Sequence, residues 1–337
     1  MTIRTAAITQ PNMPGRVRKM SLGEFDRYTD LIAVAFAEDQ EREGRSFRDE
    51  IRSLSHLLPL FRVMFAVAPS TENHFYTLVW DVDGRFASAV TISRQGSDTQ
   101  RWYIANVATH PDYRGRGLAR TLVAAALDRI RTQGGRYALL RVYADNQPAY
   151  RLYRGLGFRH LETSTILKGE AHPIAASALP DHYALRPVPQ TDWHTRFAVA
   201  LRLASPETKS VCPPTEKQFQ DSWIGRNMQT LISRAQHVQQ QAWAVAVADQ
   251  PIGLVTSRAS SGGSNPHQLQ IEIDLDHLGA APAAIAHAIQ YCVDQRSGAA
   301  HPLLIDIAGS APDSIDYLRA NGFTPIESAH ELGMKVL

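Results

Sequence analysis

The sequence predicts a mixed α/β fold, with mixed sheets, that occurs twice along one chain of 337 residues as two tandem domains. Three observations predict it. Apolar runs of strand length alternate with longer segments whose apolar residues recur at helical spacing. Asp83-Gly84 and Asp249-Gln250 each join two such runs as hairpin turns do. After a segment rich in alanine, proline and glycine, from Lys168 to Asp181, the same order of elements starts again.

This pattern divides the chain into four parts. Residues 1–15 are expected to be a flexible N-terminus, 16–168 a first domain, 169–182 a linker and 183–337 a second domain. Each domain is long enough to enclose its own hydrophobic core.

The first domain is expected to run strand, two helices, three strands, helix, strand, helix and strand. Its strands are expected at 17–20, 75–82, 86–93, 102–108, 137–143 and up to about 167, and its helices at 21–36, between 36 and 75, at 118–130 and from Asn146. Ser21 and Glu24 have the spacing of a capping box at the start of the first helix. The last helix carries Pro148 near its first turn and ends at Gly155 or Gly157.

A glycine loop lies between the strand at 102–108 and the helix at 118–130. It reads Arg114-Gly115-Arg116-Gly117-Leu118-Ala119. The first N–H groups of a helix have no internal partner, and the macrodipole adds about half a positive charge there, so a diphosphate binds well at such an end. Arg114, Arg116 and Arg120 add charged donors, each contributing about 1.5 to 3 kcal/mol. A solvated basic turn is the alternative interpretation.

Two motifs, separated by a strand and a helix, resemble those of a known family. Arg114, Gly117 and Ala119 match the pattern Arg/Gln-x-x-Gly-x-Gly/Ala. The positions that match the pattern Asn-x-x-Ala-x-x-x-Tyr-x-x-x-Gly-Phe are Asn146, Ala149, Tyr153, Gly157 and Phe158. Both motifs resemble those of the GNAT superfamily of N-acetyltransferases, whose order of elements is also the one expected here.

The resemblance implies acetyl-CoA as co-substrate. It implies that the strands at Val107 and Leu139 separate and free backbone N–H groups for the pantetheine arm and the acyl carbonyl. It also implies Tyr153 as the acid for the departing thiolate, although Tyr150 competes for this role and a core tyrosine is the alternative. The cofactor contacts expected from the loop and the resemblance together are Val107, Ala108, Thr109, Arg114, Gly115, Arg116, Gly117, Leu118, Ala119, Arg120, Asn146 and Tyr150.

The sequence offers several candidates for the general base that takes the proton from the amine. Some relatives place a glutamate just ahead of the asparagine, where this chain has Arg141. Carboxylates of the acidic segment 38–43 are candidates, although a mixed charge run is usually a solvated face. Water relayed by Asn106 or Tyr143 is a further alternative.

The second domain repeats the order of elements without the chemistry. Strands are expected at 184–188, 242–248, 252–258, 268–275 and 303–307, and helices from Thr191, from Pro282 and up to about Asn321. Gly322-Phe323 stands where Gly157-Phe158 stands in the first domain, but no arginine or lysine lies between 275 and 289. Counting back from Gly322 places Leu318 at the position of Tyr153 and Ala311 at that of Asn146. The second domain is therefore expected to be degenerate; an unrelated α/β domain is the alternative.

Composition excludes several classes of function. A formal net charge of +2 and dispersed arginines argue against nucleic acid as a partner. His277 and His287 lack neighbouring ligands at metal-binding spacing, so no metal is expected. Cys212 and Cys292 suggest no disulfide framework, and no secretory or membrane-spanning segment is recognisable, so a cytoplasmic location without membrane contact is expected.

The sequence therefore predicts acetyl transfer from acetyl-CoA to a primary amine, with a small-molecule acceptor favoured because a large second domain suits a bounded cleft. Two alternatives remain, namely a protein acetyltransferase acting on N-termini or lysines, and a non-catalytic CoA-responsive binding protein. A monomer or a homodimer is expected.

Overall fold

The structure is a computed structural model. It describes residues 13–37, 75–95, 97–174, 178–220, 237–261, 266–295, 301–308 and 312–336, together with Arg226, Thr230, Leu231, Ser233 and Arg234. The acidic segment at 38–43 and the helix expected between 36 and 75 lie outside these ranges, apart from the residues up to 37.

The described elements have the following bounds. The strands are β1 (Arg16–Lys19), β2 (Phe75–Val82), β3 (Arg85–Gln95), β4 (Asp98–Thr109), β5 (Tyr137–Tyr143), β6 (Arg159–Glu170), β7 (Tyr183–Pro187), β8 (Val238–Val247), β9 (Gln250–Ser260), β10 (His267–Ile273), β11 (Pro302–Ala308) and β12 (Thr324–Lys335). The helices are η1 (Leu22–Glu24), α1 (Phe25–Ala35), η2 (Pro111–Tyr113), α6 (Leu118–Thr132), α7 (Gln147–Gly155), α8 (Trp193–Leu203), α9 (Pro206–Val211), α10 (Glu216–Phe219), η3 (Leu275–Ala280), α12 (Ala281–Asp294) and α13 (Pro312–Ala320).

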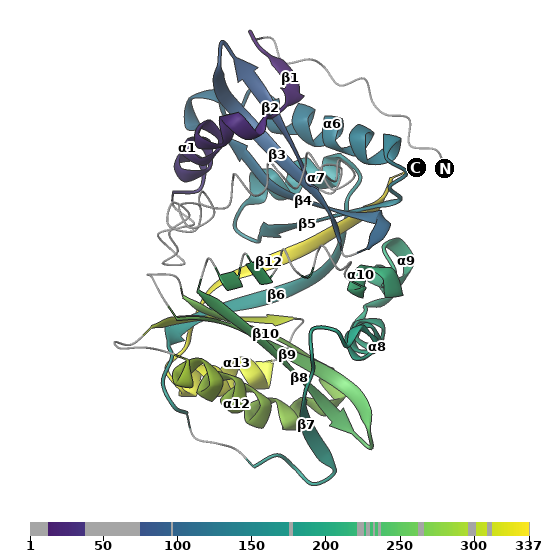
Figure 1. Cartoon of the computed structure of the whole chain (residues 1–337), viewed down its shortest axis with the longest axis vertical. Coiled ribbons are helices and arrows are strands. Elements are labelled where there is room, and N and C mark those ends of the chain that lie inside the picture. Colours follow the sequence, from purple (N-terminus) through teal and green to yellow (C-terminus); the bar gives the residue numbers. More distant parts are fainter. Residues whose placement is uncertain are drawn as a thin grey trace.

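All described strands join one sheet in the order β1-β2-β3-β4-β5-β12-β6-β11-β10-β9-β8-β7. The mixed α/β fold expected from the sequence is confirmed, and Figure 1 shows the two halves of the chain above and below the crossing strands β6 and β12. Within the described residues, no helix combines the length and the apolar composition needed to cross a membrane.

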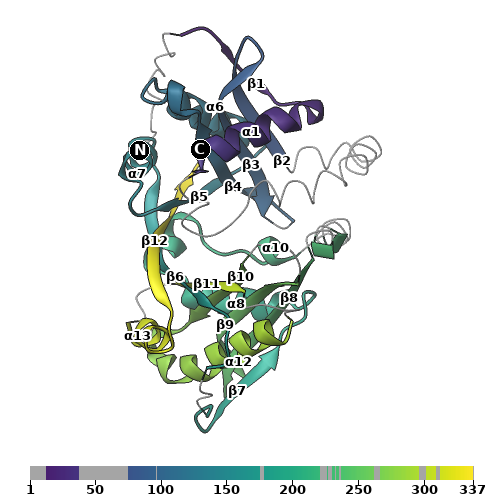
Figure 2. The same cartoon turned by 90° about the vertical axis from the view of Figure 1, so that its left-hand side faces the viewer.

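The two halves exchange their last strands. β6 ends the first half but pairs with β11 of the second, whereas β12 ends the second half and pairs with β5 of the first. β6 and β12 also pair with each other, so one sheet runs through both halves (Figure 2). The sequence predicts the helix before Asn321 as the last element of the second half, so β12 is an element that its pattern does not predict.

Helices cover both faces of each half-sheet. In the first half, α6 packs with Leu78, Ile92 and Trp102, while α1 packs with Val79 and Ala89 on the opposite face. In the second half, α12 forms the main core with strands β8 to β11, and α8 covers the other face of β9.

The architectural repeat is visible at the ends of α7 and α13. Phe158 N–H donates to the carbonyl of Tyr153 at 3.1 Å, and Phe323 N–H donates to the carbonyl of Leu318 at 3.0 Å. Gly157 and Gly322, which precede the two phenylalanines, both have positive φ, 98° and 84°. Leu318 therefore occupies the place of Tyr153, as the sequence count predicted, whereas Ala311 lies outside the described residues.

Two local expectations were displaced by one or two residues. The helix expected from Thr191 begins at Trp193, because Asp192 caps it by accepting from the N–H of Thr195 at 3.1 Å. The hairpin expected around Asp249-Gln250 turns instead at Ala248 and Asp249, the two residues with positive φ, 46° and 64°.

A segment of the second half returns to the first. After α8, the chain passes α9, which contacts β6 and β12, and α10, which contacts β4. The hydroxyl of Thr215 donates to Asp98 Oδ2 at 2.6 Å, and Arg101 Nη2 donates to the carbonyl of Cys212 at 3.0 Å. The halves are thus joined by these contacts as well as by the exchanged strands.

Candidate active site

The separation of β4 from β5 defines the candidate site. These parallel strands pair from Arg101 opposite Tyr137 to Ile104 opposite Leu140, after which β4 continues unpaired with β5 to Thr109. On its other edge β4 shifts register against β3 between Ala89 and Thr91, and Asn106 takes a positive φ of 50° at this bulge. The expected opening is therefore observed at Val107, but Leu139 still pairs with Tyr103, so the strands separate only beyond Ile104 and Leu140.

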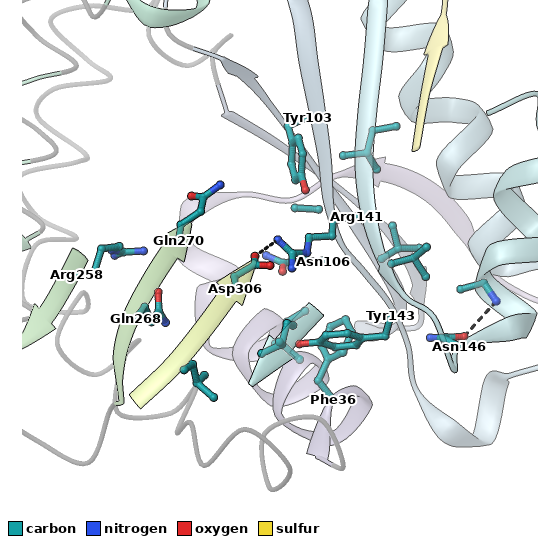
Figure 3. Close-up of a pocket in the computed structure, with 18 of the residues that line it drawn as sticks. Phe36, Tyr103, Asn106, Arg141, Tyr143, Asn146, Arg258, Gln268, Gln270 and Asp306 are labelled. Atoms are coloured by element: carbon teal, nitrogen blue, oxygen red, sulfur yellow. Dashed lines mark hydrogen bonds and ion pairs between the residues drawn. The ribbon is translucent and has the colours of Figure 1, made fainter. Parts of the chain in front are cut away.

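A cavity of about 650 Å³ lies at this opening, between the two halves. The first half contributes Ile32, Phe36, Tyr103, Ile104, Ala105, Asn106, Val107, Arg141, Val142, Tyr143, Asn146, Ala149 and Tyr153. The exchanged strand β6 contributes Ile166, and the second half contributes Gln240, Thr256, Arg258, Gln268, Leu269, Gln270, Leu304 and Asp306. Figure 3 shows labelled side chains from both halves facing this space.

Tyr153 lines the cavity from α7. Its side chain is buried, with an exposed fraction of 5%, and its ring meets Phe158 edge-on at 6.0 Å. Burial raises the pKa of the Tyr153 hydroxyl above its ordinary value, so the hydroxyl stays protonated at neutral pH. No hydrogen bond joins this hydroxyl to another of the described residues, which leaves it available as a donor.

Tyr150, the competing tyrosine, points elsewhere. Its ring lies 5.3 Å from that of His330 and 6.3 Å from that of His160, and it does not line the cavity. Asn146 lines the cavity and also caps α7, because its Oδ1 accepts from the N–H of Ala149 at 3.1 Å.

The glycine loop lies outside the cavity lining, at the exposed N-terminus of α6. Gly115 and Gly117 have φ of 75° and 79°, a conformation that side-chain-bearing residues rarely adopt. A methyl group built at either glycine would meet nothing within 4 Å, so the space above the loop is open. Leu118 is buried in the core and Ala119 is half-buried, so these two would meet a ligand through their backbone N–H groups.

The three loop arginines contact carbonyls around this helix end. Arg114 Nη2 donates to Ala35 at 3.1 Å, Arg116 Nη2 to Asp112 at 3.1 Å, and Arg120 Nη2 to Gly155 at 3.3 Å. All three contacts are exposed, so an anion at the helix end would meet their positive charge.

Arg141 and Asp306 form an ion pair between the halves. Arg141 Nη1 lies 2.5 Å from Asp306 Oδ2, and its Nη2 donates to the hydroxyl of Ser164 at 2.9 Å. Asp306 is the one carboxylate among the described residues that line the cavity. The sequence does not reveal Asp306 as a site residue, since it lies 165 positions after Arg141 and its only signal is one polar residue within the apolar run 303–307.

Asn106 and Tyr143, the residues considered for a water relay, both line the cavity. The Asn106 amide donates to the Tyr28 hydroxyl at 2.9 Å, and this hydroxyl also contacts that of Thr91 at 3.1 Å. Trp80 and Trp102, two large aromatic residues of the neighbouring strands, do not line the cavity and are buried in the core.

The corresponding region of the second half is closed. β10 and β11 pair from His267 opposite Leu303 to Ile271 opposite Ile307, almost to the ends of both strands. At the start of α12, which η3 precedes directly, Ala281 is buried, and Pro282 and Ala283 are half-buried. Neither an opening between strands nor an exposed helix end with arginines is present there in the described residues.

Comparison with known proteins identifies the family. Residues 35–158 match the model of the acetyltransferase (GNAT) family. A Bacillus subtilis protein whose name assigns it to alanine N-acetylation of ribosomal protein bS18 is 31% identical over 144 residues, which are 42% of this chain and 80% of that protein. The chain belongs to the GNAT family of acetyltransferases.

Other relatives match over shorter lengths. A mycothiol acetyltransferase from Corynebacterium aurimucosum is 36% identical over 89 residues, which are 24% of this chain and 29% of that protein. N-alpha-acetyltransferase 30 from Schizosaccharomyces pombe is 37% identical over 76 residues, which are 22% of this chain and 51% of that protein. The chain thus spans between about a third and half of the length of these two relatives.

The tandem architecture is confirmed by solved structures. A tandem GNAT protein from the clavulanic acid biosynthesis pathway aligns with a TM-score of 0.59 and 14% identity over 96% of this chain and 98% of that one. A GCN5-related N-acetyltransferase from Sphaerobacter thermophilus aligns with a TM-score of 0.56 and 14% identity over 95% of each chain. At this identity the likeness shows the fold alone.

Proposed function

We propose that this protein transfers the acetyl group of acetyl-CoA to a primary amine of a small molecule, by direct attack of the amine on the thioester. The observation that carries the proposal is the opening between β4 and β5, which faces a cavity that Tyr153 helps to line.

Two neighbouring parts of the first half would hold one molecule of acetyl-CoA. The diphosphate would lie at the exposed N-terminus of α6, with the loop N–H groups and Arg114, Arg116 and Arg120 as donors. The unpaired edge of β4 from Val107 to Thr109 would hold the pantetheine arm and the acyl carbonyl. A backbone donor to the developing oxyanion commonly contributes about 2.7 to 4 kcal/mol.

The proposed reaction converts an ammonium group and a thioester into an acetamide and a thiol. The acceptor ammonium loses one proton, its nitrogen attacks the acyl carbon, and a C–N bond forms as the C–S bond breaks. Tyr153 donates a hydrogen bond and then its proton to the thiolate and is reprotonated from solvent, and the amine nitrogen releases its second proton. The products are the acetamide, the free thiol of CoA and one net proton.

The two halves are proposed to have different roles. Residues 16–168 would bind acetyl-CoA, and residues 183–337, after the linker 169–182, would be a degenerate copy that closes the acceptor cavity. The paired ends of β10 and β11, and Leu318 at the place of Tyr153, support this division.

A small-molecule acceptor is favoured over a protein because the second half bounds the cavity with β8 to β11. The Bacillus subtilis relative is named as an N-acetyltransferase of a ribosomal protein, for which a protein chain must enter the site.

The test is an acceptor screen that monitors thiol release from acetyl-CoA, combined with calorimetry of CoA binding. Turnover with small amines in preference to peptides supports the proposal. Binding of acetyl-CoA without turnover on any amine would favour a CoA-responsive binding protein, and preferential turnover of peptides would favour a protein acetyltransferase.

A further inference from the structure

We infer that Asp306 binds the ammonium group of the acceptor, so that the second half selects small polar molecules with a single cationic amine. This inference deepens the proposed function and rests on it. Asp306 comes from β11, in the half that lacks the acetyl-CoA features.

Position and accessibility point to Asp306. It is the one carboxylate among the described residues that line the 650 Å³ cavity, and 23% of its side chain is exposed. An ammonium group that enters this cavity meets in Asp306 the one opposite charge that these residues offer. Neutral donors and acceptors flank it, since Gln270 is its register neighbour on β10 and Thr256 follows on β9.

The Asp306 carboxylate is held in place and keeps free acceptor capacity. Arg141 reaches it from β5 and is itself fixed by Ser164 on β6. A carboxylate can accept about four hydrogen bonds. Asp306 accepts from Arg141 at Oδ2, whereas its Oδ1 is buried and has no donor among the described residues. Arg141 thus fixes the carboxylate through Oδ2 and leaves the buried Oδ1 without a donor, which an ammonium group bound at Asp306 would supply (Figure 3).

Further carboxyl groups lie behind Asp306. A small cavity of about 50 Å³ shares Asp306 and Arg141 with the large one, and Glu162, Glu272 and Glu331 line it. On β4, Tyr103 is neutral, because burial raises the pKa of its hydroxyl, and the cation Arg101 acts on Glu331. Burial also raises the pKa of all three glutamates, to about 7 for Glu162 and Glu272, so these groups add little negative charge at neutral pH.

The large cavity does not suit a polycation. Besides Asp306, its charged lining residues in the described chain are Arg141 and Arg258. One ammonium group can pair with Asp306, but further positive groups would approach two guanidinium groups. Hydroxyl or carbonyl groups on the acceptor would instead meet Gln268, Gln270 and Thr256.

The test measures binding separately from turnover. With CoA present, calorimetry on the full chain compares glucosamine with glucose and ethanolamine with ethylene glycol, and adds spermidine as a polyamine. We expect the wild-type protein to bind at least one amine more tightly than its neutral analogue, and more tightly than spermidine. Asp306→Asn should reduce the preference for the amine by roughly ten to a hundredfold and leave CoA affinity unchanged.

The matched control is Asp249→Asn, which removes the carboxylate of the exposed pair with Arg186 in the same half and should leave the preference intact. An equal preference in Asp306→Asn, or no preference in the wild-type protein, overturns the inference. If the variant fails to fold, the comparison of each amine with its neutral analogue in the wild-type protein still tests the inference. Amine binding that depends on Asp306 without any thiol release would instead overturn the proposed function alone.

Discussion

At Glu272 the fold half-buries a carboxyl group among other carboxylates. Burial, and then the nearby carboxylates of Glu162, Glu331 and Asp306, raises the pKa of Glu272 to about 7. The folded state therefore keeps a proton that the unfolded chain releases near pH 4. Stability from this group is fully present below the unfolded pKa and is lost as the pH rises to about 7.

Glu272→Gln should remove this pH dependence. The variant is expected to melt at least about 2 °C above the wild-type protein at pH 8, the shift that 1 kcal/mol gives in a domain of 150–250 residues. The difference should shrink towards pH 5, where the wild-type carboxyl is protonated. Melting curves at both pH values check this, with the exposed Glu216→Gln as control. An equal shift at both pH values would contradict it.

Tyr153 and Tyr150 give a second prediction at the residue scale, because they lie on one helix but face different surroundings. Tyr153→Phe should lower kcat by about 100-fold or more, the usual contribution of general acid–base catalysis, without weakening acetyl-CoA binding. Tyr150→Phe retains the ring against His330 and should leave kcat within about threefold. Steady-state kinetics with an acceptor from the screen decides, and a larger loss in Tyr150→Phe would exchange the two roles.

At the scale of elements, the N-terminus of α6 is expected to hold the diphosphate. Arg114→Ala combined with Arg116→Ala should weaken CoA binding tenfold or more, which corresponds to about 1.4 kcal/mol. A matched double variant at the far end of the same helix, Arg129→Ala with Arg131→Ala, removes equal charge. Calorimetry that finds the same CoA affinity for both double variants would refute the assignment of the phosphate site.

Local signals predicted the elements that depend on local interactions. β2 and β5 have the bounds expected from their apolar runs, and the hairpin turns where Asp83 and Gly84 adopt positive φ. β12 escaped prediction because Thr324–Lys335 includes a proline, a glycine and two glutamates, which are uncommon in strands. It is a strand because it pairs with β5 and β6 on its two edges, with register shifts at Pro325 and Glu331.

Local signals likewise predict some residues of the candidate site and not others. The glycine loop, Asn146 and Tyr153 are sequence motifs whose members lie within a few turns of one another, so their spacing is visible in the sequence. Asp306 reaches Arg141 only because β6 and β12 bring β11 towards β5. A contact across 165 positions leaves no periodic trace in one sequence.

At the scale of the whole molecule, the exchanged strands couple the acetyl-CoA region to the end of the chain. Residues 1–170 alone lack β12, so β5 would keep an unpaired edge and β6 would lose both of its partners. Exposed edges of this kind favour aggregation. Each half therefore completes its sheet with a strand from the other.

A fragment of residues 1–170 is accordingly expected to aggregate or to bind acetyl-CoA at least tenfold more weakly than the full chain, whereas co-expression with residues 171–337 should restore a soluble complex with full affinity. The break falls just after β6, so both exchanged strands stay intact and only their covalent connection is lost. Size-exclusion chromatography and calorimetry distinguish the cases. A monomeric 1–170 fragment that binds acetyl-CoA with the affinity of the full chain would contradict this prediction, because it would show that the sheet of the first half forms without β12.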